Sequence, residues 1–158
     1  MELLSQLGFS RVQVNVTPAN GVHVDRTLLP DYARNLRHAV ESVPQIEWIF
    51  LLNDETQGLW NLISADGDVP GNMSVLFHFS FMELMLTPII QPPLSNPDVM
   101  CGYGGFGPES LYQVLGQIME TCAGKPVWVH MDSSLRGQAV FSMKIVWVCI
   151  EIGIRRGM

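Results

Sequence analysis

Two stretches in the second half of the chain combine residue types that suit anionic ligands. The first, "CGYGGFGPESL" (101–111), places Gly104, Gly105 and Gly107 directly before a segment with helical spacing. Glycine lets a ligand approach the backbone, and the first N–H groups of a helix carry the positive end of its dipole. The spacing matches neither a Walker A loop nor a complete GxGxxG motif. The pattern predicts a phosphate-binding turn, with a tight turn that binds nothing as the alternative.

The second stretch, "HMDSSLRG" (130–137), adds hydroxyl groups and a cation. Ser133 and Ser134 offer side-chain and backbone donors, and Arg136 would either reach an anion or remain solvated. Both stretches follow predicted strands, and parallel α/β folds bind ligands beyond the carboxyl ends of their strands. We therefore expect the two loops to lie together and to bind one phosphorylated small molecule.

Acid–base chemistry has two candidate residues, His78 and Asp54. His78 lies in the apolar run "SVLFHFS". A histidine titrates near neutral pH, although a buried histidine bonded to a backbone carbonyl is the alternative. Asp54 follows "EWIFLLN", at a strand end where catalytic carboxylates occur, or it belongs to the first turn of the next helix. His130 and Asp132 would point to opposite faces of a strand, so they form no dyad within it. The four histidines lack ligand spacing, and we expect no metal and no cofactor.

Strands and helices are predicted to alternate along the chain. Apolar runs and alternation predict strands near 11–16, 47–53, 72–80, 99–105 and 126–132, with an additional short strand at 89–91. Helical spacing and caps predict helices near 1–8, 30–43, 54–64 and 108–124. The tail 142–156 fits a strand or a helix, and its length and caps favour the helix. This order predicts a single α/β domain over residues 1–158, with parallel strands alternating with helices.

The two loop motifs resemble those of a known enzyme family. "CGYGGFGPESL" followed by "KPVWVHMDSSLRG" is similar to the closing half of phosphoribosylanthranilate isomerase. That family carries a glycine pair, a helix-opening "NPE" or "GPE", and a strand that runs into "DSS". "IFLLNDETQGLW" resembles its fourth strand and following helix. The resemblance implies a TIM (β/α)₈ barrel, of which this chain would hold the later six units, and an isomerase acting on a phosphorylated sugar derivative.

The chain departs from that family at both catalytic positions. The family's general base is a cysteine in a "KxCG" motif, which this sequence lacks, and its general acid is an aspartate where His78 or Phe79 stands here. Without both groups, we expect a phosphate-binding protein with no isomerase turnover. Two alternatives remain open. One is a non-catalytic truncated barrel that acts through self-association; the other is an open doubly wound α/β enzyme that uses strand-end carboxylates, Asp54 or Asp132.

Composition narrows the classes of partner and location. The net charge of −6 argues against nucleic acid, which requires a basic face. The sequence has neither a long uncharged apolar run nor a signal-peptide pattern, so we expect no membrane partner and a cytoplasmic location. Three cysteines without CxxC spacing fit reduced thiols there. The predicted strands leave open sheet edges at Val14 and Val129, which predicts a homo-oligomer, most simply a dimer.

Overall fold

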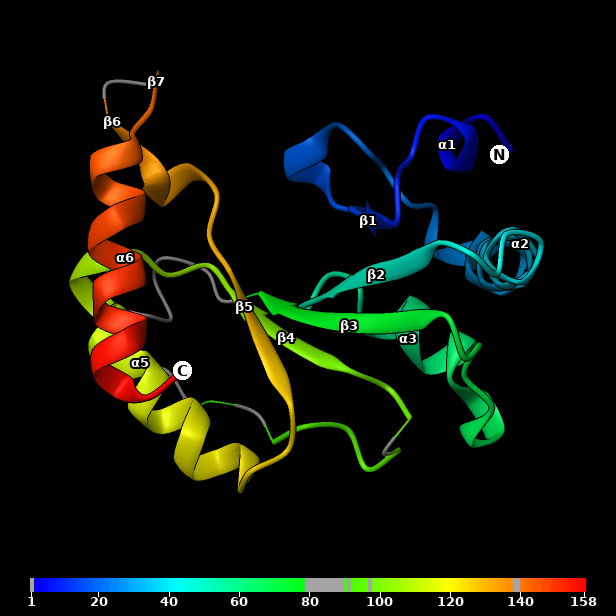
Figure 1. Cartoon of the computed structure of the whole chain (residues 1–158). Helices are drawn as coiled ribbons and strands as arrows, with labels where there is room; N and C mark the ends of the chain where they lie inside the picture. Colours follow the sequence, from blue (N-terminus) through cyan, green and yellow to red (C-terminus); the bar gives the residue numbers. More distant parts are fainter. Residues whose placement is uncertain (1, 79–89, 91, 97, 138–139) are drawn as a thin grey trace. The chain divides into compact units, whose positions relative to one another are not determined.

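A computed structural model describes residues 2–78, 90, 92–96, 98–137 and 140–158 (Figure 1). In this part of the chain, strands and helices alternate and five strands form a parallel sheet. The strands of the sheet are β1 (Arg11–Val14), β2 (Glu47–Leu52), β3 (Met73–His78), β4 (Cys101–Gly104) and β5 (Val127–His130). The helices are α1 (Glu2–Gln6), α2 (Leu29–Glu41), α3 (Gln57–Ile63), α5 (Pro108–Cys122) and α6 (Met143–Arg156). The predicted α/β class with parallel strands is confirmed.

The strands of the sheet follow one another in chain order, β1-β2-β3-β4-β5. A doubly wound sheet reverses its strand order at a switch point, and the described strands show no such reversal. Strands that succeed one another without reversal also make up a (β/α)₈ barrel. The additional strand predicted at 89–91 falls outside the described residues, except for Ile90, which belongs to no strand.

The described residues group into two compact units, of which the first spans Met1–Phe77 and Leu94–Cys101. Its strand β2 is buried along nearly its whole length, as its continuous apolar run predicts for a strand covered on both faces. The parallel register sets Arg11 of β1 opposite Glu47 of β2. Their side chains form an ion pair with Nε and Oε2 2.7 Å apart, which fastens the start of one strand to the start of the next.

One amide side chain holds the connection between α2 and β2 in the first unit. The Nδ2 of Asn72, the residue before β3, donates hydrogen bonds to the carbonyl oxygens of Val40, Val43 and Ile46, at 3.0, 3.2 and 3.1 Å. These carbonyls belong to the last turn of α2 and to the turn that follows it. Because one side chain bonds three carbonyls of the same turn, Asn72 stabilises the turn that leads into β2.

The second unit spans His78–Pro93 and Gly102–Met158. In it α5 and α6 lie side by side (Figure 1). The guanidinium of Arg156 lies over the ring of Tyr112, 3.6 Å from its centroid, and its Nε donates to the Tyr112 carbonyl at 2.9 Å. A Cβ on Gly116 would lie 3.1 Å from the same guanidinium, so the glycine makes room for it. These contacts fasten the end of α6 to α5.

The tail of the chain is the helix that its length and caps favour. α6 follows Ser142, whose Oγ accepts a hydrogen bond from the Ile145 N–H at 3.5 Å, and it closes at Gly157 with φ 83°. A short antiparallel hairpin of β6 (Arg136–Gly137) and β7 (Val140–Phe141) precedes it. This hairpin was not predicted, because strands of two residues carry no periodic pattern. No helix in the described part of the chain is long and apolar enough to cross a bilayer.

Candidate anion-binding site

The structure brings the two loops predicted to bind an anion into contact within the second unit. The Ser134 hydroxyl donates a hydrogen bond to the carbonyl oxygen of Phe106 at 2.9 Å. A Cβ on Gly107 would lie 3.0 Å from the Cβ of Ser134, so a larger residue at 107 would force the loops apart. We call residues 104–107 and 132–136 together the glycine–serine edge.

Local sequence explains the shape of the glycine loop. β4 ends at Gly104, and Gly105 then adopts φ 93°, a conformation that side-chain-bearing residues rarely take. Gly107 caps the start of α5, and its N–H donates to the Oγ of Ser110 at 3.4 Å. Pro108 is suited to the first helical position, because it lacks an N–H that would otherwise remain unpaired. Since α5 is 15 residues long, the positive end of a full helix dipole lies at this loop.

The serine loop follows β5 as a short 3₁₀ turn over Ser133–Leu135. Ser133 is exposed and Ser134 is half-buried. Because the Ser134 hydroxyl hydrogen is donated to Phe106, this side chain holds the two loops together. An anion at the edge would therefore meet backbone N–H groups rather than the Ser134 hydroxyl. The side chain of Arg136 is 53% exposed, and its guanidinium pairs with the Asp132 carboxylate at 3.2 Å.

Two carboxylates would compete with an anion at the glycine–serine edge. One is Asp132, which already pairs with Arg136. The other is Glu109, whose Oε2 lies 3.3 Å from the position that a Cβ on Gly107 would take. Burial, and then the charge of Glu109, raise the pKa of the Cys149 thiol on α6 above its ordinary value. The negative charges of Asp132 and Glu109 partly offset the positive charges of the helix terminus and of Arg136. We therefore expect anion binding at this edge to be weak.

The two candidates for acid–base chemistry lie in different compact units. His78 is the last residue of β3 and is half-buried, in the second unit. Asp54 is exposed and follows β2, in the first unit. The turn at Asp54 is held by Asn53, whose Oδ1 accepts the N–H of Thr56 at 3.1 Å. For this reason α3 begins at Gln57, later than predicted, and Asp54 lies outside the helix.

Asp54 lines a pocket of the first unit that the sequence did not predict. The pocket has a volume of about 270 Å³ and lies beyond the carboxyl ends of β1 and β2. Its lining residues are Val16, Pro18, Val24, Arg26, Leu29, Asp54, Glu55, Gly58 and Leu59. The general position of ligand sites in parallel sheets would have pointed to these residues. The loop after β1, however, carries no motif that marks it. Within the described residues, no group of His, Cys, Asp and Glu side chains would hold a metal ion.

The fold and this edge define an α/β protein with parallel strands and two touching strand-end loops in its second unit. In comparisons with known proteins, no protein-family model, no curated protein and no solved structure matches the chain. The likeness to phosphoribosylanthranilate isomerase therefore rests on the loop motifs, and it stays a prediction.

Proposed function

We propose that the chain binds a phosphorylated small molecule at the glycine–serine edge. The observation that supports this most directly is the contact between the loops, where Ser134 donates to the Phe106 carbonyl at 2.9 Å. A phosphate group at this edge would accept hydrogen bonds from backbone N–H groups and would meet the positive end of α5. Arg136 adds a side-chain cation once the phosphate competes with Asp132 for it.

The proposal includes a relationship to the (β/α)₈ barrel. In such barrels the phosphate site is frequently built by the loops after the last two strands. The two loops of the glycine–serine edge follow β4 and β5, which are consecutive in the described sheet. The chain would correspond to the later part of such a barrel, as a phosphate-binding relative of phosphoribosylanthranilate isomerase.

We expect no isomerase turnover from this chain. A general acid or base typically contributes about 10²- to 10⁴-fold to a rate, and this chain has neither the family's cysteine motif nor its aspartate. Purified protein mixed with phosphoribosylanthranilate should leave the substrate unchanged beyond its spontaneous reaction. Robust turnover that disappears in His78→Ala would contradict this expectation and would make His78 the acid.

Thermal unfolding with added inorganic phosphate or ribose 5-phosphate tests the binding proposal. At ten times Kd, a ligand that binds only the folded state adds about 1.4 kcal/mol, or about 3–5 °C in Tm for a chain of this size. Gly105→Val should abolish the shift, because it removes the backbone conformation of the loop. Gly124→Val is the matched control, since Gly124 also has a positive φ, 82°, and open space around it.

A second pair of variants separates specific binding from a general salt effect. Arg136→Gln should weaken phosphate binding. Arg34→Gln is the matched control and should not weaken it, because Arg34 is an exposed arginine outside the edge whose guanidinium pairs with the Asp31 carboxylate at 2.5 Å. A Tm rise of equal size in all four variants would be a salt effect. That result, or no rise in the parent protein, contradicts the proposal.

The pocket of the first unit supports a second candidate function, small-molecule binding at strand-end carboxylates. Its volume of about 270 Å³ lies just below the usual range of ligand pockets, so it suits a small ligand. Asp54 and Glu55 outnumber Arg26 there, which favours a ligand that carries an amine. Stabilisation of the parent by small amines or amino acids, lost in Asp54→Asn, would support this function. No stabilisation by any of them would contradict it.

Self-association and a cytoplasmic location complete the proposal. The three cysteines are buried, which suits thiols of a reducing compartment. β1 and β5 are the end strands of the described sheet. Their residues are half-buried, except for Arg11, which is exposed. Open end strands of this kind are one reason to expect that the chain self-associates. A monomeric mass by light scattering would contradict self-association.

A further inference from the structure

α6 is apolar on two sides, although only one of them packs within the second unit. Its inner residues are buried or half-buried, and they include Ile145, Cys149 and Ile152. Its outer side exposes Met143, Trp147, Ile150 and Ile154, at 69%, 63%, 47% and 67% of their surface. A helix that is apolar all round is normally buried all round. The outer side of α6 therefore has the character of an interface.

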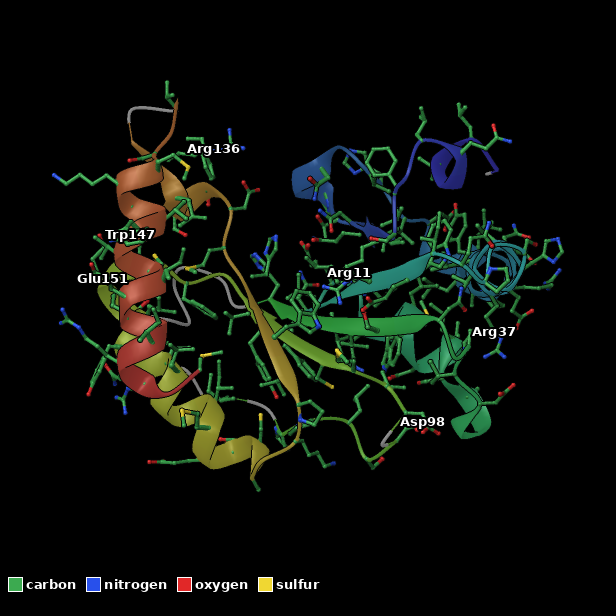
Figure 2. The ribbon with its side chains drawn as sticks, in the orientation of Figure 1. Arg11, Arg37, Asp98, Arg136, Trp147 and Glu151 are labelled. Atoms are coloured by element: carbon green, nitrogen blue, oxygen red, sulfur yellow. The ribbon has the colours of Figure 1, made fainter. Side chains whose placement is uncertain are left out.

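The outer residues have the spacing of a helix-pairing seam. Met143, Trp147, Ile150 and Ile154 are separated by four, three and four residues, the repeat of positions d and a in a coiled coil. The indole of Trp147 is held on this side, because its Nε1 donates to the Oε1 of Glu151 at 3.0 Å. Figure 2 shows Trp147 and Glu151 on the same side of α6.

We propose that the outer side of α6 binds the same surface of a second copy of this chain, as an antiparallel two-fold helix pair. The seam reads the same in both directions about a point between residues 148 and 149. An antiparallel partner would pack its Ile154 against Met143 and its Ile150 against Trp147. Each contact would then occur twice, as a two-fold interface requires.

The charges beside the seam favour the antiparallel direction. Lys144 and Glu151 lie on the same flank, one heptad apart. Antiparallel pairing places Lys144 of one copy beside Glu151 of the other, and two-fold symmetry makes this pair twice. A parallel pair would instead stack Trp147 on its own copy. In a parallel pair, Lys144 and Glu151 would also face the opposite flank of the partner helix. That flank carries Val146 and Gly153, which have no charge to pair with them.

The exposed area is sufficient for such an interface. The four seam residues expose on the order of 500 Å² per chain, given the areas of large apolar side chains. Two copies together present on the order of 1,000 Å² of seam surface, which is about the area expected of a stable interface. This inference is independent of phosphate binding, and it locates self-association on α6 rather than at the sheet edges.

Light scattering of the purified protein, from low to high micromolar concentration, tests the proposal. The parent protein should show a mass near twice 17.6 kDa. Ile150→Glu should be monomeric, because it places a carboxylate in the seam. Leu62→Glu on α3 is the matched control, since Leu62 is 39% exposed and lies in the first unit, and it should remain dimeric. A monomeric parent at every concentration, or a dimer unaffected by Ile150→Glu, overturns the proposal.

A charge exchange tests the direction of the helix pair. Lys144→Glu turns both predicted ion pairs into repulsions and should raise the dimer Kd by about tenfold, given the usual strength of exposed pairs. The double variant Lys144→Glu with Glu151→Lys restores opposite charges and should return Kd close to the parent value. If the double variant dissociates more readily than Lys144→Glu alone, the antiparallel pair is wrong.

Discussion

Replacement of Gly102 by alanine should destabilise the second unit through a single steric conflict. Gly102 lies in β4 and is buried, and a Cβ there would overlap the indole ring of Trp128 in the neighbouring strand β5. Gly102 does not have a positive φ, so the backbone itself accepts alanine without strain. The cost therefore comes from the displacement of the indole or of β5.

The magnitude follows from two opposing effects. Overpacking of a well-packed position costs about 1–3 kcal/mol. Alanine in place of glycine recovers about 0.4–1 kcal/mol, because it restricts the unfolded chain. Because the new Cβ would lie within 2.7 Å of three indole atoms, the overpacking cost should fall in the upper half of its range. The net loss in the free energy of unfolding should then be about 1–2.5 kcal/mol, which corresponds to about 2–10 °C in Tm.

Urea unfolding monitored by circular dichroism measures this loss. Gly137→Ala is the control, because a Cβ there meets no atom within 4 Å, and it should change stability little. In a Trp128→Leu background the indole is absent, so Gly102→Ala should no longer be destabilising. An equal cost of Gly102→Ala in both backgrounds would refute the reasoning, as would a Gly102→Ala protein as stable as the parent.

Three further predictions concern single side chains. Asn72→Ala should lower the free energy of unfolding by about 1–3 kcal/mol, and Asn72→Asp by more, because a carboxylate would then face three carbonyl oxygens; urea unfolding compares the two variants. Because the pKa of Cys149 is raised in the folded state, its thiol loses the proton at a higher pH in the folded chain than in the unfolded chain. The free energy of unfolding should therefore fall as the pH rises beyond 9.0, the ordinary pKa of a cysteine thiol. Unfolding at pH 8 and pH 10 should show this loss in the parent and less of it in Cys149→Ala. Glu109→Gln should lower the pKa of Cys149, measured as thiolate absorbance in a pH titration with Cys149→Ala as the blank, and should tighten phosphate binding, measured by the Tm shift; unchanged values contradict the assigned role of Glu109.

The order of helices and strands could be predicted because this chain marks its elements clearly. The apolar run of β2 and the stripe of α5 have the length and period of their elements, and Ser142 and Gly157 mark the two ends of α6. The start of α3 was misplaced, because the bond between Asn53 and Thr56 holds the chain in a turn before the helix. Whether residues 53–56 form this turn or the first turn of the helix depends on a local side-chain hydrogen bond, which helix propensities do not describe.

The candidate site could be predicted only in part. Parallel strands place the loops that follow them at one edge of the sheet, and this rule predicted that the loops of Gly107 and Ser134 lie together, as they do. The sequence did not show that the Ser134 hydroxyl would donate its hydrogen to the Phe106 carbonyl, nor that the Glu109 carboxylate would lie so close to Gly107. Both facts depend on the separation of two loops far apart in the chain. The exposed seam of α6 was also missed, because a helix with two apolar sides looks like a fully buried one in sequence.

The central claim is that a phosphate group binds at the glycine–serine edge, and an NMR titration of ¹⁵N-labelled protein tests it most directly. Ribose 5-phosphate and inorganic phosphate should both shift the backbone amide signals of Gly105, Gly107, Ser133 and Ser134 in a saturable way. The amide signals of Arg26 and Asp54, in the pocket of the first unit, should stay in place. The absence of saturable shifts at the edge, or shifts confined to that pocket, would contradict the account.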